Sequence, residues 1–98
     1  MVAYAVFGIR NIEGGPDGDL FQAYVQAALP TTAGHDVKLL AGPEPGYMLE
    51  GERLEKTVML EFPTRAEAEA WYYGDYQRAK AMREKISECF AFIIESSS

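Results

Sequence analysis

The chain has 98 residues, a length that fits one domain with a single hydrophobic core and excludes a two-domain enzyme. Its 48% apolar and 24% charged residues exclude a compositionally disordered chain. Nine Lys and Arg against fifteen Asp and Glu give a formal net charge of −6, which disfavours nucleic acid and anionic membrane surfaces as partners.

Soft metal ligands are scarce in this chain. One His and one Cys are too few for a closed His/Cys zinc site or an intramolecular disulfide, so we expect no metal and no cofactor. The first ten residues have no basic segment before their apolar run, and the longest uncharged stretch, 20–35, is interrupted by polar residues and Pro30. These features predict a soluble, cytoplasmic protein that does not span a membrane.

The first predicted elements are a strand, a turn and a helix. Residues 2–10 are rich in strand formers and run into the glycine-rich segment 13–18, which lacks the Lys-Ser/Thr of a phosphate loop and is therefore a turn. After Asp19, a good N-cap, apolar residues recur at spacings of three and four: Leu20, Phe21, Tyr24, Val25 and Ala28. Pro30 should kink or end this helix, with Gly34 closing any remaining turn.

The middle of the chain predicts two strands joined by an exposed hairpin loop. The apolar run 37–41 is interrupted by the Gly/Pro segment 42–46, and residues 47–50 resume a bulged second strand. The charged residues 52–56 form the loop. In the third strand, 57–62, Val58, Leu60 and Phe62 face one way and Met59 and Glu61 the other.

A second helix and a fourth strand complete the chain. Pro63 ends the third strand, and the Thr64-Arg65-Ala66-Glu67 sequence is a capping box that starts the helix. Acidic residues near its start and basic residues near its end complement the helix dipole, while Gly74-Asp75 predicts a kink or brief break after Tyr73. Residues 90–94 form the last strand.

The predicted order is β-α-β-β-α-β, an α+β ferredoxin-like fold in which two helices cover one face of a four-stranded antiparallel sheet. We expect one domain over residues 1–95 and a frayed tail at 96–98. Strands one, three and four carry apolar residues on both faces, more than one chain can cover: Tyr4, Phe7, Met59, Leu60, Phe92 and Ile93. We infer a homodimer that buries the second face of the sheet.

The sequence also resembles a known family over nearly its whole length. The residues that carry the resemblance are Phe21-x-x-Tyr24, Pro30, His35, Leu49-Glu50-Gly51, Glu61-Phe62-Pro63, Trp71-Tyr72, Tyr76-Gln77 and Arg83. In this order and spacing they resemble the domain of unknown function 1330 family, within the dimeric α/β-barrel superfamily. The resemblance implies a dimer built by packing sheet against sheet, and it implies no agreed reaction.

Two features depart from the family pattern. Asp36-Val37 replaces the Gly-Gly pair usual after His35, and the loop at Gly14-Gly15-Pro16 looks longer than usual. Both changes would reshape the entrance to a cavity near the first helix.

Three residues are candidate catalytic groups. Glu61 is either a partly buried carboxylate paired with Arg or Tyr, or a general base in a cleft. The planar fork of Arg83 suits a substrate carboxylate or Glu61 itself, and the alternative is a solvated helix face. His35 lies where the first helix ends, so a capping or surface role competes with a catalytic one.

The aromatic residues near Gly74 are the candidate ligand contacts. Trp71, Tyr72 and Tyr76 belong either to the core or a dimer interface, or to the wall of a binding pocket. Cys89 is interpreted as a small buried hydrophobe.

The leading functional hypothesis is a homodimeric small-molecule-binding protein with a cleft between the second helix and the sheet. Glu61, Trp71, Tyr72, Tyr76 and Arg83 would line this cleft, and His35 is a further candidate. A cofactor-free enzyme of isomerase or monooxygenase type is one form of this hypothesis, and a structural or interaction module without catalysis is the alternative. An RNA-binding domain is disfavoured, because 56–62 lacks the Gly-aromatic stacking platform and the charge is negative.

Overall fold

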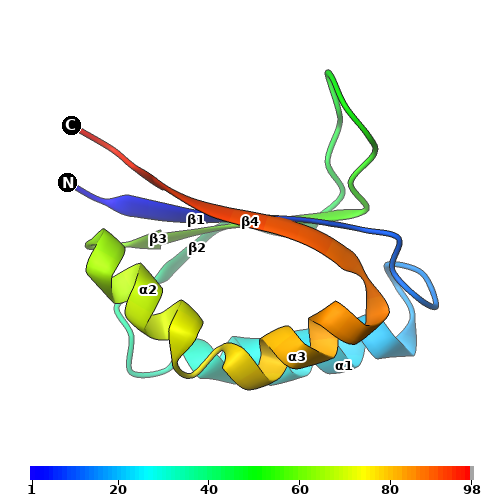
Figure 1. The fold of residues 1–98 in the computed structure, drawn as a ribbon, viewed down its shortest axis with the longest axis horizontal. Coiled ribbons are helices and arrows are strands. Elements are labelled where there is room, and N and C mark those ends of the chain that lie inside the picture. The colour runs from blue at the N-terminus through cyan, green and yellow to red at the C-terminus, as the bar shows by residue number, and fades with distance from the viewer. Residues whose placement is uncertain (98) are drawn as a thin grey trace.

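The computed structural model describes residues 1–97 and contains one four-stranded antiparallel sheet with helices on one face (Figure 1). The elements in chain order are β1 (Ala3–Arg10), α1 (Asp19–Ala28), the 3-10 helix η1 (Leu29–Thr32), β2 (Lys38–Glu44), β3 (Lys56–Phe62), α2 (Arg65–Tyr73), α3 (Gln77–Ile86) and β4 (Glu88–Glu95). The strand order is β2-β3-β1-β4. The ferredoxin-like α+β prediction is confirmed, with the second helix in two pieces.

Strand alternation decides which side chains face the helices. In the central strand β1, the odd-numbered residues from Ala3 to Ile9 are buried beneath the helices, and Leu60 and Phe62 of β3 lie on the same side. The opposite side, which we call the open face, carries Tyr4, Val6, Met59, Glu61, Phe90, Phe92 and Ile94. Four of its apolar side chains are exposed in the single chain: Met59, Phe90, Phe92 and Ile94.

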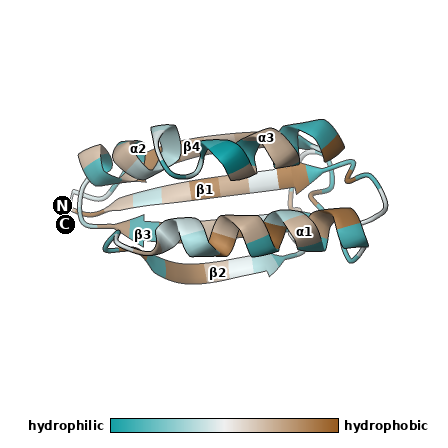
Figure 2. Cartoon of the chain, turned by 90° about the horizontal axis from the view of Figure 1, so that it is seen from below, coloured by the Kyte–Doolittle hydropathy of each residue, from teal (hydrophilic) through white to brown (hydrophobic). Residues whose placement is uncertain are grey.

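The two helical rows share the covered face of the sheet. Seen from the helix side, α1 lies over β3 and β2, whereas α2 and α3 follow one another along β1 and β4 (Figure 2). Both α1 and α2 turn an apolar stripe toward the sheet, contributing Phe21, Tyr24 and Trp71 to the core. No helix within residues 1–97 is long and apolar enough to cross a membrane.

The ends of α1 follow the local sequence closely. Gly18 rather than Asp19 occupies the N-cap, so Asp19 lies in the first turn, where its negative charge complements the helix dipole. The α-helix ends at Ala28, before Pro30, and the chain continues as the 3-10 helix η1 with proline in its first positions. Gly34 then adopts a positive φ of 84°.

The break in the second helix lies where it was predicted. Thr64 caps α2 by accepting a hydrogen bond from the Glu67 backbone N–H at 3.1 Å. α2 ends at Tyr73, and the backbone N–H groups of Gly74 and Tyr76 both donate to the carbonyl oxygen of Trp71. A Cβ at Gly74 would lie 2.6 Å from the Ala70 carbonyl oxygen, so this close turn requires glycine.

The second strand differs from its prediction. β2 continues through Gly42 and Pro43 to Glu44 with two register irregularities, which confirms the bulged strand but moves its end. Gly42 has a φ of +93°, and a Cβ there would lie 2.0 Å from the Thr57 carbonyl oxygen. Glycine thus lets the two strands stay paired through a segment that reads as a turn.

The residues expected to resume the second strand belong to a loop instead. Residues 47–50 are not in a strand. They belong to a long loop between β2 and β3 that rises from the sheet, away from the helices (Figure 1). At the C-terminus, the Ser96 backbone N–H donates to the carbonyl oxygen of Val2 at 2.9 Å, and of the predicted tail at 96–98, Ser98 lies outside the described residues.

Candidate functional site

A chain of hydrogen bonds crosses the core from α3 to α1. Arg83 Nε donates to the Tyr76 hydroxyl at 3.1 Å, and that hydroxyl lies 2.6 Å from the Tyr24 hydroxyl. Tyr76 is only 1% exposed and Arg83 only 4%. Three polar side chains, from α1, from α3 and from the N-cap of α3, therefore satisfy one another inside an otherwise apolar core.

Burial sets the direction of the pKa shifts of the tyrosines in this row of hydrogen bonds. Desolvation raises the pKa of Tyr24 and of Tyr76 above the usual tyrosine value, in spite of the nearby positive charge of Arg83, which acts to lower both. Desolvation likewise raises the pKa of the Cys89 thiol, again against the effect of Arg83. The two phenols are therefore neutral hydrogen-bonding groups at neutral pH and not bases.

Arg83 is the member of this buried hydrogen-bond chain that carries a charge at neutral pH. Its guanidinium carbon lies 5.9 Å from the Phe7 ring centroid and 6.0 Å from that of Tyr76. No carboxylate in residues 1–97 forms an ion pair with it. A buried guanidinium is normally paired with a carboxylate, so the protein holds a positive charge here whose acidic partner is not supplied by the described part of the chain.

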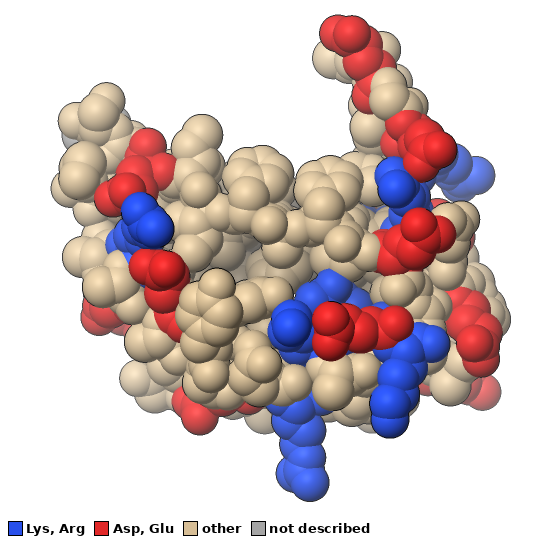
Figure 3. All heavy atoms as spheres, in the orientation of Figure 1, with Lys and Arg blue, Asp and Glu red and all other residues tan. Residues whose placement is uncertain are grey.

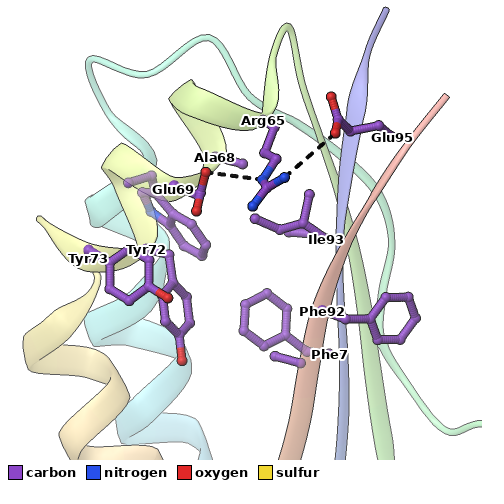
Figure 4. A pocket seen from close by; sticks show the side chains of 12 residues that line it. Phe7, Arg65, Ala68, Glu69, Tyr72, Tyr73, Phe92, Ile93 and Glu95 are labelled. Carbon is purple, nitrogen blue, oxygen red and sulfur yellow. Dashed lines mark ion pairs between the residues drawn. The ribbon is translucent and has the colours of Figure 1, made fainter. Parts of the chain in front are cut away.

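A groove beside α2, which we call the α2 groove, opens between that helix and strands β1 and β4. Its volume is about 420 Å³, and its aromatic wall includes Phe7, Tyr72 and Tyr73 (Figure 4). Arg65 lies at one end, with Nε 3.2 Å from Glu69 Oε1 and Nη1 3.9 Å from Glu95 Oε1. This end of the groove is therefore already neutralised by two carboxylates.

A second groove, the α3 groove, adjoins the first between α3 and β4. It has a volume of about 350 Å³ and is lined by Tyr72, Lys80, Arg83, Glu84, Ser87, Cys89 and Ala91. Tyr72 and Ala91 line both grooves, so the two are neighbours along the same helix-strand seam. Lys80 and Glu84 pair with each other at 3.6 Å, which leaves Arg83 as the unpaired charge of the α3 groove.

The three predicted aromatic contacts have different environments. Trp71 is 2% exposed, stacks on Tyr76 with ring centroids 4.5 Å apart, and donates its indole N–H to Thr31 Oγ1 at 3.0 Å. Tyr76 is buried beside it. Tyr72 is half-buried and lines both grooves. Tyr76 lines neither groove and serves the core, whereas Trp71 serves both the core and the wall of the α2 groove. Tyr72 is the predicted residue best placed to touch a ligand.

Glu61 lies apart from the other candidate site residues. Its neighbours Leu60 and Phe62 point to the helices, so alternation turns Glu61 to the open face, where its carboxylate lies 3.9 Å from Lys38 Nζ. The expectation that Glu61 and Arg83 share a cleft, or pair with each other, is therefore corrected. The two residues lie on opposite sides of the sheet.

His35 also lies apart from both grooves. Its Nε2 is 2.8 Å from Asp75 Oδ2, in the break between α2 and α3. This contact joins the segment after η1 to the helix break. It is a surface role, which was the alternative to a catalytic role for His35 in the sequence analysis.

Two residues of this region were missed or undervalued in the sequence. The sequence predicts Tyr24 only as part of the apolar face of α1 and of the family resemblance, although its hydroxyl ends the buried hydrogen-bond chain. Cys89 lines the α3 groove. Tyrosine at a core position of a helix is a usable signal, because a buried phenol needs a polar partner.

The family model of a domain of unknown function, DUF1330, matches residues 3–97. The chain belongs to the DUF1330 family. No curated protein matches it.

Solved structures share the fold at low sequence identity. A protein of unknown function from Rhodopseudomonas palustris has 16% identity and a TM-score of 0.72, covering 99% of this DUF1330 chain and 83% of the other. A dimeric ferredoxin-like protein of unknown function from Jannaschia sp. has 18% identity and a TM-score of 0.67, covering 98% and 100%. SnoaB, a cofactor-independent oxygenase from Streptomyces nogalater, has 8% identity and a TM-score of 0.56, covering 99% and 92%. The TM-scores show a common fold, and at these identities the likeness shows the fold alone.

Proposed function

We propose that this DUF1330 protein is a homodimer that binds a small organic anion in the grooves between α2, α3 and β4. The anionic group of the ligand lies at Arg83, and its planar body lies along Tyr72 toward Phe7. The observation that carries the proposal is a buried guanidinium that no carboxylate of residues 1–97 pairs with.

Arg83 is well suited to this role. Its Nε is already used by the Tyr76 hydroxyl, which fixes the plane of the guanidinium, and its side chain also hydrogen-bonds to Cys89. The remaining N–H groups are the donors for a ligand. A guanidinium held in one orientation binds a carboxylate with little further loss of side-chain entropy. Its position in the wall of the α3 groove supports access for a ligand.

The size and lining of the grooves support a small aromatic or planar ligand. About 420 Å³ in the α2 groove is within the range of small-molecule sites. The rings of Phe7 and Tyr72, with centroids 6.5 Å apart, offer apolar surface beside the charge at Arg83.

The open face supports the dimer. Exposed Met59, Phe90, Phe92 and Ile94 on one sheet face form an apolar surface of the kind that marks a protein interface. The dimeric ferredoxin-like protein from Jannaschia sp. adds support from the shared fold. In such a dimer the Glu61–Lys38 pair lies at or near the interface.

A cofactor-free reaction of isomerase or monooxygenase type is a second candidate, favoured by the fold shared with the oxygenase SnoaB. Of the three predicted catalytic residues, Arg83 lines a groove, where it would stabilise negative charge on a bound substrate. Glu61 and His35 would need a dimer partner or a structural rearrangement to reach that substrate.

The binding proposal is tested by calorimetric titration with 2-naphthoate and its neutral analogue 2-naphthamide. We expect the wild type to bind naphthoate more tightly, and Arg83→Gln to weaken naphthoate binding by about tenfold or more while leaving naphthamide binding unchanged. Arg78→Gln is the matched control, because Arg78 lies on the same helix but is exposed. Arg83→Lys keeps the charge without the fork and should show intermediate affinity.

Equal affinity of the wild type for the acid and the amide would contradict the anion site, and so would an unchanged affinity in Arg83→Gln. Absence of binding for both probes would favour the alternative, a structural or interaction module without a ligand. Circular dichroism of each variant separates loss of binding from loss of fold.

A further inference from the structure

The loop between β2 and β3 forms an arm, which we define as residues 45–55. It rises from the sheet on the side of the open face, whereas all helices lie on the other side (Figure 1). In the space-filling view the arm stands clear of the body, and the edge of the body between the arm and the chain termini consists mostly of uncharged residues (Figure 3). The arm therefore borders the open face without covering it.

The root of the arm is firmly held. The Gly46 backbone N–H donates to the carbonyl oxygen of Leu54 at 3.2 Å, which joins the two legs. Arg10 Nη1 lies 2.8 Å from Glu52 Oε2, and the Glu55 backbone N–H donates to the carbonyl oxygen of Ile9 at 2.9 Å. These contacts fix the direction in which the arm leaves the sheet.

The tip carries apolar side chains that touch little of their own chain. Tyr47 is 92% exposed and Leu49 is 98% exposed, the largest exposures among the large apolar residues of the protomer. Single exposed apolar residues are common, but two on a loop with an anchored root form a surface that is preorganised for contact.

The arm is continuous with the open face. Leu54, in the arm's second leg, is 7% exposed and lies over Gly8 of β1 next to Phe90, since a Cβ at Gly8 would lie 3.0 Å from Leu54 Cδ1 and 2.5 Å from Phe90 Cζ. The exposed apolar row then runs along β4 through Phe92 to Ile94. Any molecule seated on the open face beside Phe90 meets the arm as well.

We propose that the arm grips the second copy of this chain in the homodimer, with Tyr47 and Leu49 buried against the partner. This inference rests on the proposed dimer and extends it from the sheet face to the arm. In a two-fold dimer each protomer contributes one arm and receives one, so every arm contact occurs twice. The arms add apolar interface at the rim of a flat sheet and fix how the two sheets are aligned.

The proposal is tested by sedimentation equilibrium of the full chain and of the Tyr47→Ser/Leu49→Ser double variant. We expect the dimer dissociation constant to rise about 100-fold or more, because two apolar side chains leave the interface in each of two arms. Both residues are exposed within the protomer, so the variant should fold normally. Leu20→Ser is the control, an exposed apolar residue of α1 on the helix layer, and should leave the dissociation constant unchanged.

A covalent readout reports the contact itself. Benzoylphenylalanine in place of Leu49 should give photo-crosslinked dimers, and the same group in place of Leu20 should give none. Phe92→Asp places a charge on the open face and should produce monomers by itself.

The outcomes separate the two inferences. A wild type that is monomeric at micromolar concentration overturns both the dimer and the arm's role. A dimeric wild type that Phe92→Asp dissociates, but that keeps its affinity in the arm variant and does not crosslink through position 49, overturns the arm's role alone. Increased dissociation of the arm variant together with crosslinking supports it.

Discussion

The buried hydroxyl of Tyr76 is the most informative atom to remove. Tyr76→Phe keeps the ring, which is 1% exposed and stacked on Trp71, and deletes only the oxygen that bonds Arg83 Nε at 3.1 Å and the Tyr24 hydroxyl at 2.6 Å. The variant therefore strands a charged donor and a phenol in the core. Leaving such groups without partners costs about 1–3 kcal/mol each, and we expect a loss of about 3 kcal/mol in the free energy of unfolding.

Tyr24→Phe is the matched comparison. It removes the far end of the hydrogen-bond chain and leaves the Arg83–Tyr76 contact in place, so we expect a loss of about 1 kcal/mol. In the Tyr76→Phe background the Tyr24 hydroxyl is buried without a partner, so adding Tyr24→Phe removes that unsatisfied group and should recover about 1 kcal/mol. The double variant should thus lose about 2 kcal/mol, and the double-mutant cycle should give a coupling of about 2 kcal/mol.

The assay is urea unfolding followed by far-ultraviolet circular dichroism, at one fixed protomer concentration because the proposed dimerisation would add to stability. Equal m-values for all variants would allow the midpoints to be compared directly. A loss below about 1 kcal/mol in Tyr76→Phe, or an equal loss in Tyr24→Phe, would refute the view that Tyr76 is the central bond of this chain.

Two further predictions concern titration and capping. Because burial raises the pKa of Tyr24 and Tyr76, their contribution to stability should be constant below the usual tyrosine pKa of about 10 and be lost as pH rises above it, where the unfolded chain ionises first. The late part of the tyrosinate absorbance rise should therefore coincide with unfolding and shrink in the Tyr24→Phe/Tyr76→Phe variant; a rise complete before unfolding would argue against it. Thr64→Ala should lower the unfolding free energy by about 1 kcal/mol in the urea assay, and Thr64→Ser should restore it, because the hydroxyl accepts from Glu67 N–H.

Most of the fold could be predicted from the sequence because its local signals agreed with one another. Thr64 and Glu67 mark the start of α2, Gly74 marks its break, and Pro30 marks the end of α1, each by a backbone constraint that acts within a few residues. The two-sided apolar strands also predicted an uncovered sheet face correctly.

The parts that were not predicted depend on contacts distant in sequence. The Gly42-Pro43 segment is a turn by composition, yet it stays in β2 because Gly42 fits against Thr57 of the neighbouring strand. Residues 47–50 have strand-like composition but extend into the arm, whose path is set by Arg10 and Leu54.

The candidate site was predicted only in part, because it too depends on contacts between residues distant in sequence. Tyr72 and Arg83 were chosen from their helix and meet in one groove. Strand alternation already turned Glu61 away from Leu60 and Phe62, but the sequence did not say which face of β3 the helices cover, and so Glu61 was grouped with Arg83. The hydrogen bond between the Tyr76 and Tyr24 hydroxyls, which extends the Arg83–Tyr76 contact, needs the packing of α3 on α1, which no local pattern encodes.

The stacking of Trp71 on Tyr76 gives the protein an optical probe of its own. Trp71 is the only tryptophan of the chain, it lines the α2 groove, and the ring it touches is hydrogen-bonded to Arg83. An anion arriving at Arg83 would change the field around the Tyr76 ring, and the indole emission would respond without any label. The same side chain that packs in the core would thus report the proposed occupancy of the groove by fluorescence, in wild-type protein.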